Sequence, residues 1–408
     1  MAGLRPLRAQ CLAGSLTRSS IRPTTGTKLS PASQIQVRHK SGPYGYTQAK
    51  SLVFSEYGEP KDVLKLHTHS ISPTLPSSSL LLRTLAAPIN PADVNTVQGT
   101  YGAKPSFDTL LGTPEPSVVP GNEGVFEVVS SATPDIQRGD WVIPKKTQFG
   151  TWRTHALVPA DAVIKVDKEG LNPVQAATVA VNPCSAYRML RDYVRDPTPL
   201  REGDWFLQNG ANSGVGRAAI QLGSLWGYRS INVVRARPTP EETQKLKDEL
   251  TALGATHVVT EDEFQARDFR DKLAEWTRGT TDGVRLGLNC VGGKSAQTIA
   301  KSLGVGGPMV TYGGMARQPV ALPTGLLIFK DIRFVGFWLS RWADRDPASK
   351  QRTVAEILGL VREGKFRDVP TVEVPWTWDT EVQQLKDAVQ GTLEGFRAGK
   401  GVFVFRDT

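Results

Sequence analysis

Residues 204–237, DWFLQNGANSGVGRAAIQLGSLWGYRSINVVRAR, decide the fold. They predict a strand at 205–207, a glycine-containing loop, a helix with apolar residues at helical spacing over 218–226, and an apolar strand at 231–234. This order is typical of the first half of a Rossmann unit. The glycines of such a loop let the backbone approach a pyrophosphate, which binds to free N–H groups at the positive end of the helix dipole.

The loop glycines have an unusual spacing. Gly210, Gly214 and Gly216 occupy its first, fifth and seventh positions, whereas the common dinucleotide fingerprint is G-x-G-x-x-G. The loop alone therefore leaves an ordinary strand-to-helix turn as an alternative.

The end of the second strand indicates which dinucleotide binds. NAD sites generally place an acidic residue here for the ribose 2′-hydroxyl, and NADP sites place arginine near the 2′-phosphate. This chain has Arg235 and Arg237, and the next acidic residue is Glu241. Guanidinium groups match a phosphate in charge and geometry, so the sequence favours NADPH. Two solvated surface arginines are the alternative.

The alternation of strands and helices continues along the chain. The pattern predicts helices at 240–253, 264–278 and 295–302, and strands at 257–260, 284–291, 309–312 and 332–338. Such alternation implies a parallel sheet with right-handed crossovers. We therefore expect a doubly wound Rossmann domain over residues 188–339.

The flanking parts differ in kind. Residues 43–187 contain short strand-like runs separated by Pro, Gly and Asp, which favours an antiparallel, barrel-like β-domain. Residues 340–408 predict helices at 348–363 and 382–391 and a last strand at 401–405. A strand at the very end commonly returns to an earlier sheet, so we expect 340–408 to return to the first domain.

Positive charge is concentrated at the amino terminus. Of the net charge of +9, eight units come from lysines and arginines in the first 50 residues, and no acidic residue precedes Glu56. The rest of the chain is nearly neutral, which argues against nucleic acid as a partner. The amino-terminal segment is also rich in Ser and Thr, a composition typical of a mitochondrial transit peptide, here residues 1–42. A disordered basic tail is the alternative.

Cysteine and histidine are too sparse for a metal site. Cys11, Cys184 and Cys290 form neither a CxxC pair nor a disulfide framework, and the chain has five histidines. We expect no bound metal and a reducing compartment such as the mitochondrial matrix. No apolar run reaches the length of a membrane span, so we expect no membrane insertion.

Seven motifs together resemble the mitochondrial trans-2-enoyl-thioester reductases, a zinc-independent branch of the medium-chain dehydrogenase/reductase superfamily. They are INPADVNTVQGTYGAKP at 89–105, PGNEGVFEV at 120–128, VNPCSAYRML at 181–190, NGANSGVG at 209–216, INVVRARP at 231–238, TYGGM at 311–315 and FWLSRW at 337–342. The resemblance covers about residues 49–407. It implies an α/β protein with a GroES-like, β-rich catalytic domain and a Rossmann domain.

The resemblance also implies roles for individual residues. Tyr101 matches the family's proposed proton donor and is the catalytic candidate. The cofactor-binding candidates are Asn182, Asn212, Ser213, Gly214, Val215, Arg235, Ala236, Arg237, Tyr312, Gly313, Gly314, Met315, Phe337, Trp338, Leu339, Ser340 and Lys400. Lys400 is supported by the resemblance alone. The zinc ligands of alcohol dehydrogenases are missing, with Asn122 standing where those enzymes have histidine.

The activity implied is NADPH-dependent reduction of a trans-2-enoyl thioester, on acyl carrier protein or CoA, to the saturated thioester in mitochondrial fatty acid synthesis. A tyrosine hydroxyl can deliver the proton that this reduction needs at the α-carbon. A basic rim for CoA or phosphopantetheine is expected from Lys104, Lys145, Lys146 and Arg153. A homodimer is expected from the family. The alternatives are an NADPH:quinone oxidoreductase of the same superfamily and a non-enzymatic nucleotide-regulated binding protein.

Overall fold

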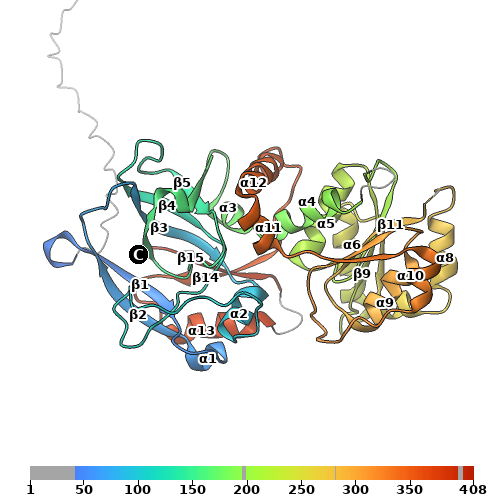
Figure 1. The fold of residues 1–408 in the computed structure, drawn as a ribbon, viewed down its shortest axis with the longest axis horizontal. Helices are drawn as coiled ribbons and strands as arrows, with labels where there is room; N and C mark the ends of the chain where they lie inside the picture. The colour runs from blue at the N-terminus through green and yellow to red at the C-terminus, as the bar shows by residue number, and fades with distance from the viewer. Residues whose placement is uncertain (1–41, 195–198, 281, 394–397) are drawn as a thin grey trace, which may run out of the picture. The chain divides into compact units, whose positions relative to one another are not determined.

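A six-stranded parallel sheet is formed by the middle part of the chain (Figure 1). Its strands are β8 (Trp205–Gln208), β9 (Arg229–Val234), β10 (His257–Thr260), β11 (Val284–Asn289), β12 (Pro308–Thr311) and β13 (Arg333–Gly336). The strand order is β10-β9-β8-β11-β12-β13, which is the Rossmann order with β8 as its first strand. The predicted doubly wound domain is therefore confirmed.

The computed structural model describes residues 42–194, 199–280, 282–393 and 398–408. Residues 1–38 and 39–408 are separate units. Apart from Gly42, the predicted transit peptide lies outside the described residues.

Helices alternate with the parallel strands as the sequence predicts. They are α5 (Gly214–Leu225), α6 (Pro240–Ala252), α7 (Glu261–Gln265), α8 (Phe269–Trp276), α9 (Gly293–Ser302) and α10 (Thr324–Lys330). The single helix expected at 264–278 is wrong, because α7 ends at an extended Ala266 and α8 starts three residues later. Phe264 and Phe269 are both buried and pack edge to face at 4.8 Å. On one continuous helix, residues five apart would lie roughly 140° apart around the axis, so both could not face the core.

A second, mixed sheet forms the catalytic domain. It contains β3 (Ser79–Pro88), β4 (Val125–Ser131), β5 (Trp141–Pro144), β6 (His155–Pro159), β7 (Val163–Val166), β14 (Thr371–Trp376) and β15 (Lys400–Phe405). The order is β14-β15-β3-β4-β5-β7, and β6 also pairs with β3. The final strand returns to the first domain as predicted, since β15 runs antiparallel to β3. The pairings among β3 to β7 are antiparallel as predicted, and the sheet becomes mixed only where β14 runs parallel to β15.

The remaining elements connect or cover these two sheets. They are the paired strands β1 (Thr47–Val53) and β2 (Lys65–Ile71), the helices α1 (Pro60–Val63), α2 (Pro91–Val97), α3 (Pro173–Thr178), α4 (Asn182–Asp192), α11 (Leu339–Arg345), α12 (Pro347–Arg362) and α13 (Val382–Gln390), and the 3-10 turns η1 (Pro43–Gly45), η2 (Ala160–Ala162) and η3 (Gly391–Leu393). The domain boundaries themselves stay a prediction. Helix α4 runs unbroken across the boundary placed at residue 188.

One apolar cluster reaches from the catalytic domain to the parallel sheet. It includes Met189 of α4, Leu222 of α5, Phe206 of β8, Ile357 of α12 and Val402 of β15, all fully buried. Burial of each such side chain stabilises the fold by about 1.5–3 kcal/mol. The shared core holds α4 against α5, where the two domains meet.

Candidate active site

A cavity of about 760 Å³ lies where the loops of both sheets converge. Of the residues that the structure describes, every predicted site residue except Arg235, Ala236 and Arg237 lines it. The loops after β8 and β11 both reach it, so it lies at the point where the strand order reverses. Ligands of open α/β sheets bind at such a switch point.

The glycine loop forms one wall of the cavity. Ser213 caps α5, with its hydroxyl oxygen accepting from the Gly216 N–H at 3.1 Å. A Cβ on Gly216 would lie 2.5 Å from the Ala211 carbonyl oxygen, so only glycine lets the helix start this close to the strand. Gly214 and Val215 line the cavity at the first turn of α5, where backbone N–H groups lack helical partners. This wall is suited to an anion.

Two segments that follow β12 and β13 form the opposite wall. Residues 312–315 fold over the end of β11, with the Met315 N–H donating to the Cys290 carbonyl at 2.9 Å. The Tyr312 hydroxyl lies beside Cys290 and Ser213, and burial raises its pKa well above the usual value. Phe337 N–H donates to the Thr311 carbonyl at 3.0 Å, which sets residues 337–340 beside residues 312–315. Gly313, Gly314, Leu339 and Ser340 therefore line the same cavity.

Tyr101 enters the cavity from the other domain. It follows α2, and its backbone N–H donates to the Asn95 carbonyl at 3.0 Å. Its hydroxyl oxygen accepts from Trp338 Nε1 at 2.8 Å and lies 3.2 Å from Ser340 Oγ. The structure thus brings the catalytic candidate to the segment predicted to line the nicotinamide pocket.

Below these walls, the predicted residues Asn182 and Lys400 meet a buried polar network whose other members the sequence analysis did not identify as part of the site. Asn90 Nδ2 donates to Glu123 Oε2 at 3.0 Å, and Lys400 Nζ donates to Asn90 Oδ1. Asn182, the first residue of α4, reaches the same Asn90 oxygen at 3.4 Å. Asp93 accepts from the Asn90 N–H at 2.9 Å. The motifs INPAD and PGNEG supply Asn90, Asp93 and Glu123, but nothing in their spacing predicts that these side chains meet.

Burial shifts the pKa of each ionisable group in this network toward its neutral form. Burial raises the pKa of the Glu123 and Asp93 carboxyls, although the Lys400 ammonium opposes the shift. Burial lowers the pKa of Lys400, and the two carboxylates oppose that shift. The Lys400 ammonium therefore interacts electrostatically with both carboxyls at the cavity floor.

The predicted phosphate clamp lies outside the cavity, directly after β9. Arg235 and Ala236 are exposed and Arg237 is partly buried. The Arg237 N–H donates to Thr243 Oγ1 at 2.8 Å, which fixes the turn into α6. Burial lowers the pKa of Arg237, and the cationic Arg235 and Arg217 lower it further. Positive charge is thus gathered where a ribose 2′-phosphate would lie.

The expected basic rim is wrong, because none of its four residues lines the cavity. Arg153 is partly buried and donates to the Phe149 carbonyl at 3.0 Å, so it is not a rim residue. Among the described residues, Thr147 and Arg317 line the cavity, whereas Lys104, Lys145 and Lys146 do not. The sequence offered no periodicity that would distinguish Arg317 from other surface arginines.

Comparison with known proteins identifies the family. Residues 214–355 match the family described as zinc-binding dehydrogenase. The mitochondrial enoyl-[acyl-carrier-protein] reductase of Yarrowia lipolytica is 49% identical over 318 residues, which cover 78% of this chain and 81% of that protein. This chain belongs to the mitochondrial enoyl-[acyl-carrier-protein] reductases.

A solved member and a differently named relative complete the comparison. Etr1p, part of a mitochondrial 2-enoyl thioester reductase from Candida tropicalis, was solved with NADP and crotonyl-CoA. That structure has a TM-score of 0.82 and 38% identity, covering 88% of this chain and 99% of its own. A Kluyveromyces marxianus protein named NADPH quinone oxidoreductase is 40% identical and covers 85% of this chain and 90% of its own.

The position of the superfamily's zinc ligand is used differently in this reductase. Asn122 Nδ2 donates to Asp93 Oδ1 at 2.7 Å, and its Oδ1 accepts from the Gln148 N–H at 2.7 Å. Both ends of the amide are therefore engaged with the protein. Across the described residues, no group of three or more His, Cys, Asp or Glu side chains is placed to hold a metal ion. The absence of metal stays a prediction.

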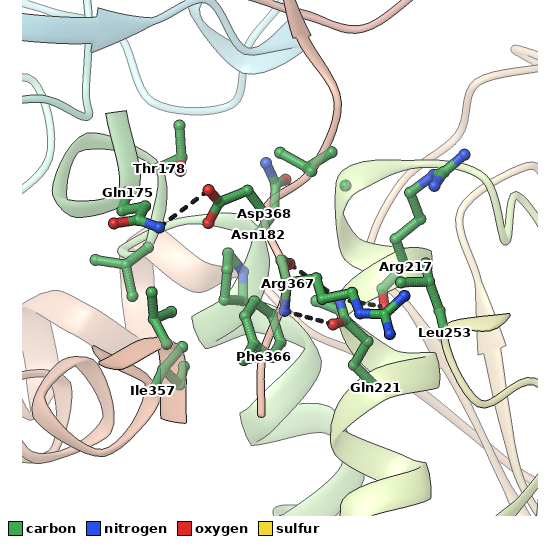
Figure 2. Close-up of a pocket in the computed structure, with 16 residues that line it drawn as sticks. Gln175, Thr178, Asn182, Arg217, Gln221, Leu253, Ile357, Phe366, Arg367 and Asp368 are labelled. Atoms are coloured by element: carbon green, nitrogen blue, oxygen red, sulfur yellow. Dashed lines mark hydrogen bonds between the residues drawn. The ribbon is translucent and has the colours of Figure 1, made fainter. Parts of the chain in front are cut away.

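A much smaller cavity, about 30 Å³, lies behind the glycine loop of the reductase (Figure 2). Gln221 of α5 binds the Arg367 backbone at both ends, accepting from its N–H at 2.7 Å and donating to its carbonyl at 3.2 Å. Gln175 of α3 donates to Asp368 at 3.0 Å. Space for about one water does not admit a ligand. The two glutamines tie the segment that leads into β14 to helices of both domains.

Proposed function

We propose that this chain is an NADPH-dependent reductase of trans-2-enoyl thioesters, carried on acyl carrier protein or CoA, that forms saturated acyl thioesters in mitochondrial fatty acid synthesis. The observation that carries the proposal is the contact of Tyr101 with Trp338 and Ser340. It places a hydroxyl of the β-rich domain in the same cavity as the glycine loop.

The residues present fit the cofactor. The backbone N–H groups at the start of α5 suit the pyrophosphate, because this end of the helix lines the cavity. Gly216 allows the helix to begin directly against Ala211. Arg235 and Arg237 would bind the 2′-phosphate, and Tyr312–Met315, Phe337–Ser340, Asn182 and Lys400 would surround the nicotinamide. When bound, NADPH supplies a hydride to the β-carbon of the substrate.

Tyr101 would complete the reaction by delivering a proton to the α-carbon. An indole N–H can only donate, so the Trp338 contact uses an oxygen lone pair and leaves the Tyr101 proton available. Ser340 Oγ, at 3.2 Å, can accept a hydrogen bond from the Tyr101 hydroxyl until a substrate takes the place of Ser340 as its partner. Reduction of a quinone does not need an acid that protonates a carbon atom, whereas reduction of an enoyl thioester does. The position of Tyr101 therefore favours enoyl reduction.

The test is NADPH oxidation by the full chain with crotonyl-CoA, hexenoyl-CoA and the same acyl groups on acyl carrier protein. Mass spectrometry should identify the saturated thioester as the product. Turnover with a quinone and none with enoyl thioesters would replace this function with the quinone reductase alternative. Binding of NADPH without either activity would favour a binding protein.

We further propose a homodimer that forms through β13 and α10. Strand β13 is an edge of the parallel sheet, pairing only with β12 among the described strands. In α10, which ends three residues before β13 begins, Leu327, Ile328 and Phe329 are 50%, 66% and 81% exposed. An apolar helix next to an unpaired edge is a typical interface. Analytical ultracentrifugation should give a dimer, and Ile328→Asp with Phe329→Asp should give a monomer.

We place the reductase in the mitochondrial matrix on the basis of residues 1–42. No helix of the described part is both long and apolar enough to cross a membrane. The test is import into isolated mitochondria followed by protease treatment after the outer membrane is opened. Protection of a shortened chain supports the matrix, and digestion contradicts it.

A further inference from the structure

Glu123 is a buried carboxyl just beneath the cavity. It is 1% exposed, it belongs to the segment that precedes β4, and it does not appear among the residues lining the cavity. Its Oε1 accepts from the Val181 backbone N–H at 2.8 Å, directly before α4. Its Oε2 accepts from Asn90 Nδ2 at 3.0 Å. Both partners are nitrogen donors, so both oxygens of Glu123 act as acceptors.

These two contacts fix the orientation of the Asn90 amide. Because the Glu123 oxygen accepts, the NH₂ end of Asn90 must face it, and the carbonyl end must face the other way. The other neighbour agrees, since the Lys400 ammonium has no acceptor and binds Asn90 Oδ1. An amide turned by half a rotation would present donors to Lys400, which costs the desolvation of an unpaired buried group.

The same Asn90 oxygen also orients Asn182. Asn182 Nδ2 lies 3.4 Å from Asn90 Oδ1, and a Cβ on Gly214 would lie 2.9 Å from that nitrogen. The Asn182 amide is therefore held between Asn90 and the glycine loop. The Glu123 carboxyl thus sets the orientation of the Asn90 amide and, through it, the positions of Lys400 and Asn182, which both line the cavity.

We propose that Glu123 is a positioning residue, whose contacts with Val181 and Asn90 hold Asn182 and Lys400 in the orientation that binds the nicotinamide end of the cofactor. This inference rests on the proposed function for the identity of the cofactor. Glu123 acts through Asn90 and would touch neither cofactor nor substrate.

The first variant is Glu123→Gln. If its oxygen keeps the Val181 N–H, its NH₂ group faces the NH₂ of Asn90, and Asn90 must turn its oxygen away from Lys400. We expect the Kd for NADPH, measured by fluorescence titration, to rise about 10- to 100-fold, the effect of leaving a buried polar group unpaired. The matched control is Glu127→Gln on β4, whose carboxylate pairs with Arg83 and lies outside the cavity. It should bind NADPH as the parent does.

The second variant moves the carboxylate one position along the network. In Glu123→Gln with Asn90→Asp, the new Asp accepts from the Gln on one side and from Lys400 and Asn182 on the other. The net charge is unchanged, and the Kd for NADPH should return to within about threefold of the parent. Asn90→Asp alone sets two carboxylates against each other and should bind NADPH more weakly than the parent.

Rescue by the double variant separates positioning from general support of the fold, because a structural role for the carboxylate would make the two changes add. Parental NADPH affinity in Glu123→Gln would overturn the proposal. So would a double variant that binds NADPH no better than Glu123→Gln while melting near the parental temperature. If Glu123→Gln does not fold, a double variant that also does not fold overturns it. A parent that binds NADPH but reduces no enoyl thioester refutes the proposed activity and leaves this binding test intact.

Discussion

Trp338 Nε1 donates a 2.8 Å hydrogen bond to the Tyr101 hydroxyl oxygen, across the boundary between the parallel sheet and the β-rich domain. The two rings meet edge to face, with centroids 6.1 Å apart. Because the indole can only donate, the tyrosine is held by its oxygen while its proton remains transferable. The contact therefore orients an acid without neutralising it.

Replacement of Tyr101 by Phe tests this role. The ring is kept and the acid is lost, so kcat with crotonyl-CoA should fall by roughly 10²- to 10⁴-fold. A group that acts in the transition state should lower kcat/KM to the same extent, while the Kd for NADPH stays near the parental value. The matched control is Tyr57→Phe, since Tyr57 packs on Phe107 outside the cavity. Parental turnover by Tyr101→Phe would remove Tyr101 from the mechanism.

The arginines after β9 should select NADPH over NADH. Loss of Arg235 and Arg237 to alanine removes charge-assisted hydrogen bonds worth about 1.5–3 kcal/mol each, less where solvent screens them. The Kd for NADPH should rise at least tenfold, whereas that for NADH should change little. Arg352→Ala with Arg406→Ala is a control of equal charge, because both arginines are exposed and lie outside the cavity. If the affinities for NADPH and NADH fell equally, Arg235 and Arg237 would only support the fold.

Chelation tests the predicted independence from metal. Asn122 is engaged at both ends of its amide, and it supplies no thiolate or imidazole ligand. We expect purified protein to contain no stoichiometric zinc and to keep full activity after dialysis against a strong chelator. One tightly bound zinc per chain, with activity restored only by zinc, would contradict this expectation.

His69 should make the β1–β2 pair sensitive to acid. Burial, the neighbouring His67 and Arg153 lower the pKa of His69 from 6.5 to about 4. The unfolded chain therefore binds this proton more readily, and stability present above about pH 6.5 is lost as the pH falls toward 4. The loss is at most roughly 3 kcal/mol, and less for a ring that is only partly buried. As the pH falls from about 7 to 4.5, the melting temperature of the parent should fall more than that of His69→Gln. An equal fall in both proteins would show that His69 does not titrate in this way.

The Rossmann half could be predicted because its signals are local. Apolar runs, glycines and helical spacing over 204–312 place β8 to β12 within a few residues of their observed bounds. Strand β14 was missed because Pro375 interrupts its pattern. The structure accommodates this proline because β14 lies at the sheet edge, paired on one side with β15.

The cavity walls could be predicted from motifs, but the floor could not. Tyr101, Asn182 and the glycine loop each lie in a recognisable stretch, and the cavity brings them together. The contact between Asn90 and Lys400 spans 310 positions and depends on the pairing of β15 with β3. No sequence periodicity encodes such a pairing, because it arises only when two distant strands meet in register.

The position of β15 has a consequence for how the cavity depends on the fold. Strand β15 lies between β14 and β3, and Lys400 is its first residue. The ammonium at the cavity floor is therefore held in place by a strand pairing between segments far apart in the sequence. A local opening that separates β15 from β3 would draw Lys400 away from Asn90, so cofactor binding should report on the integrity of this pairing.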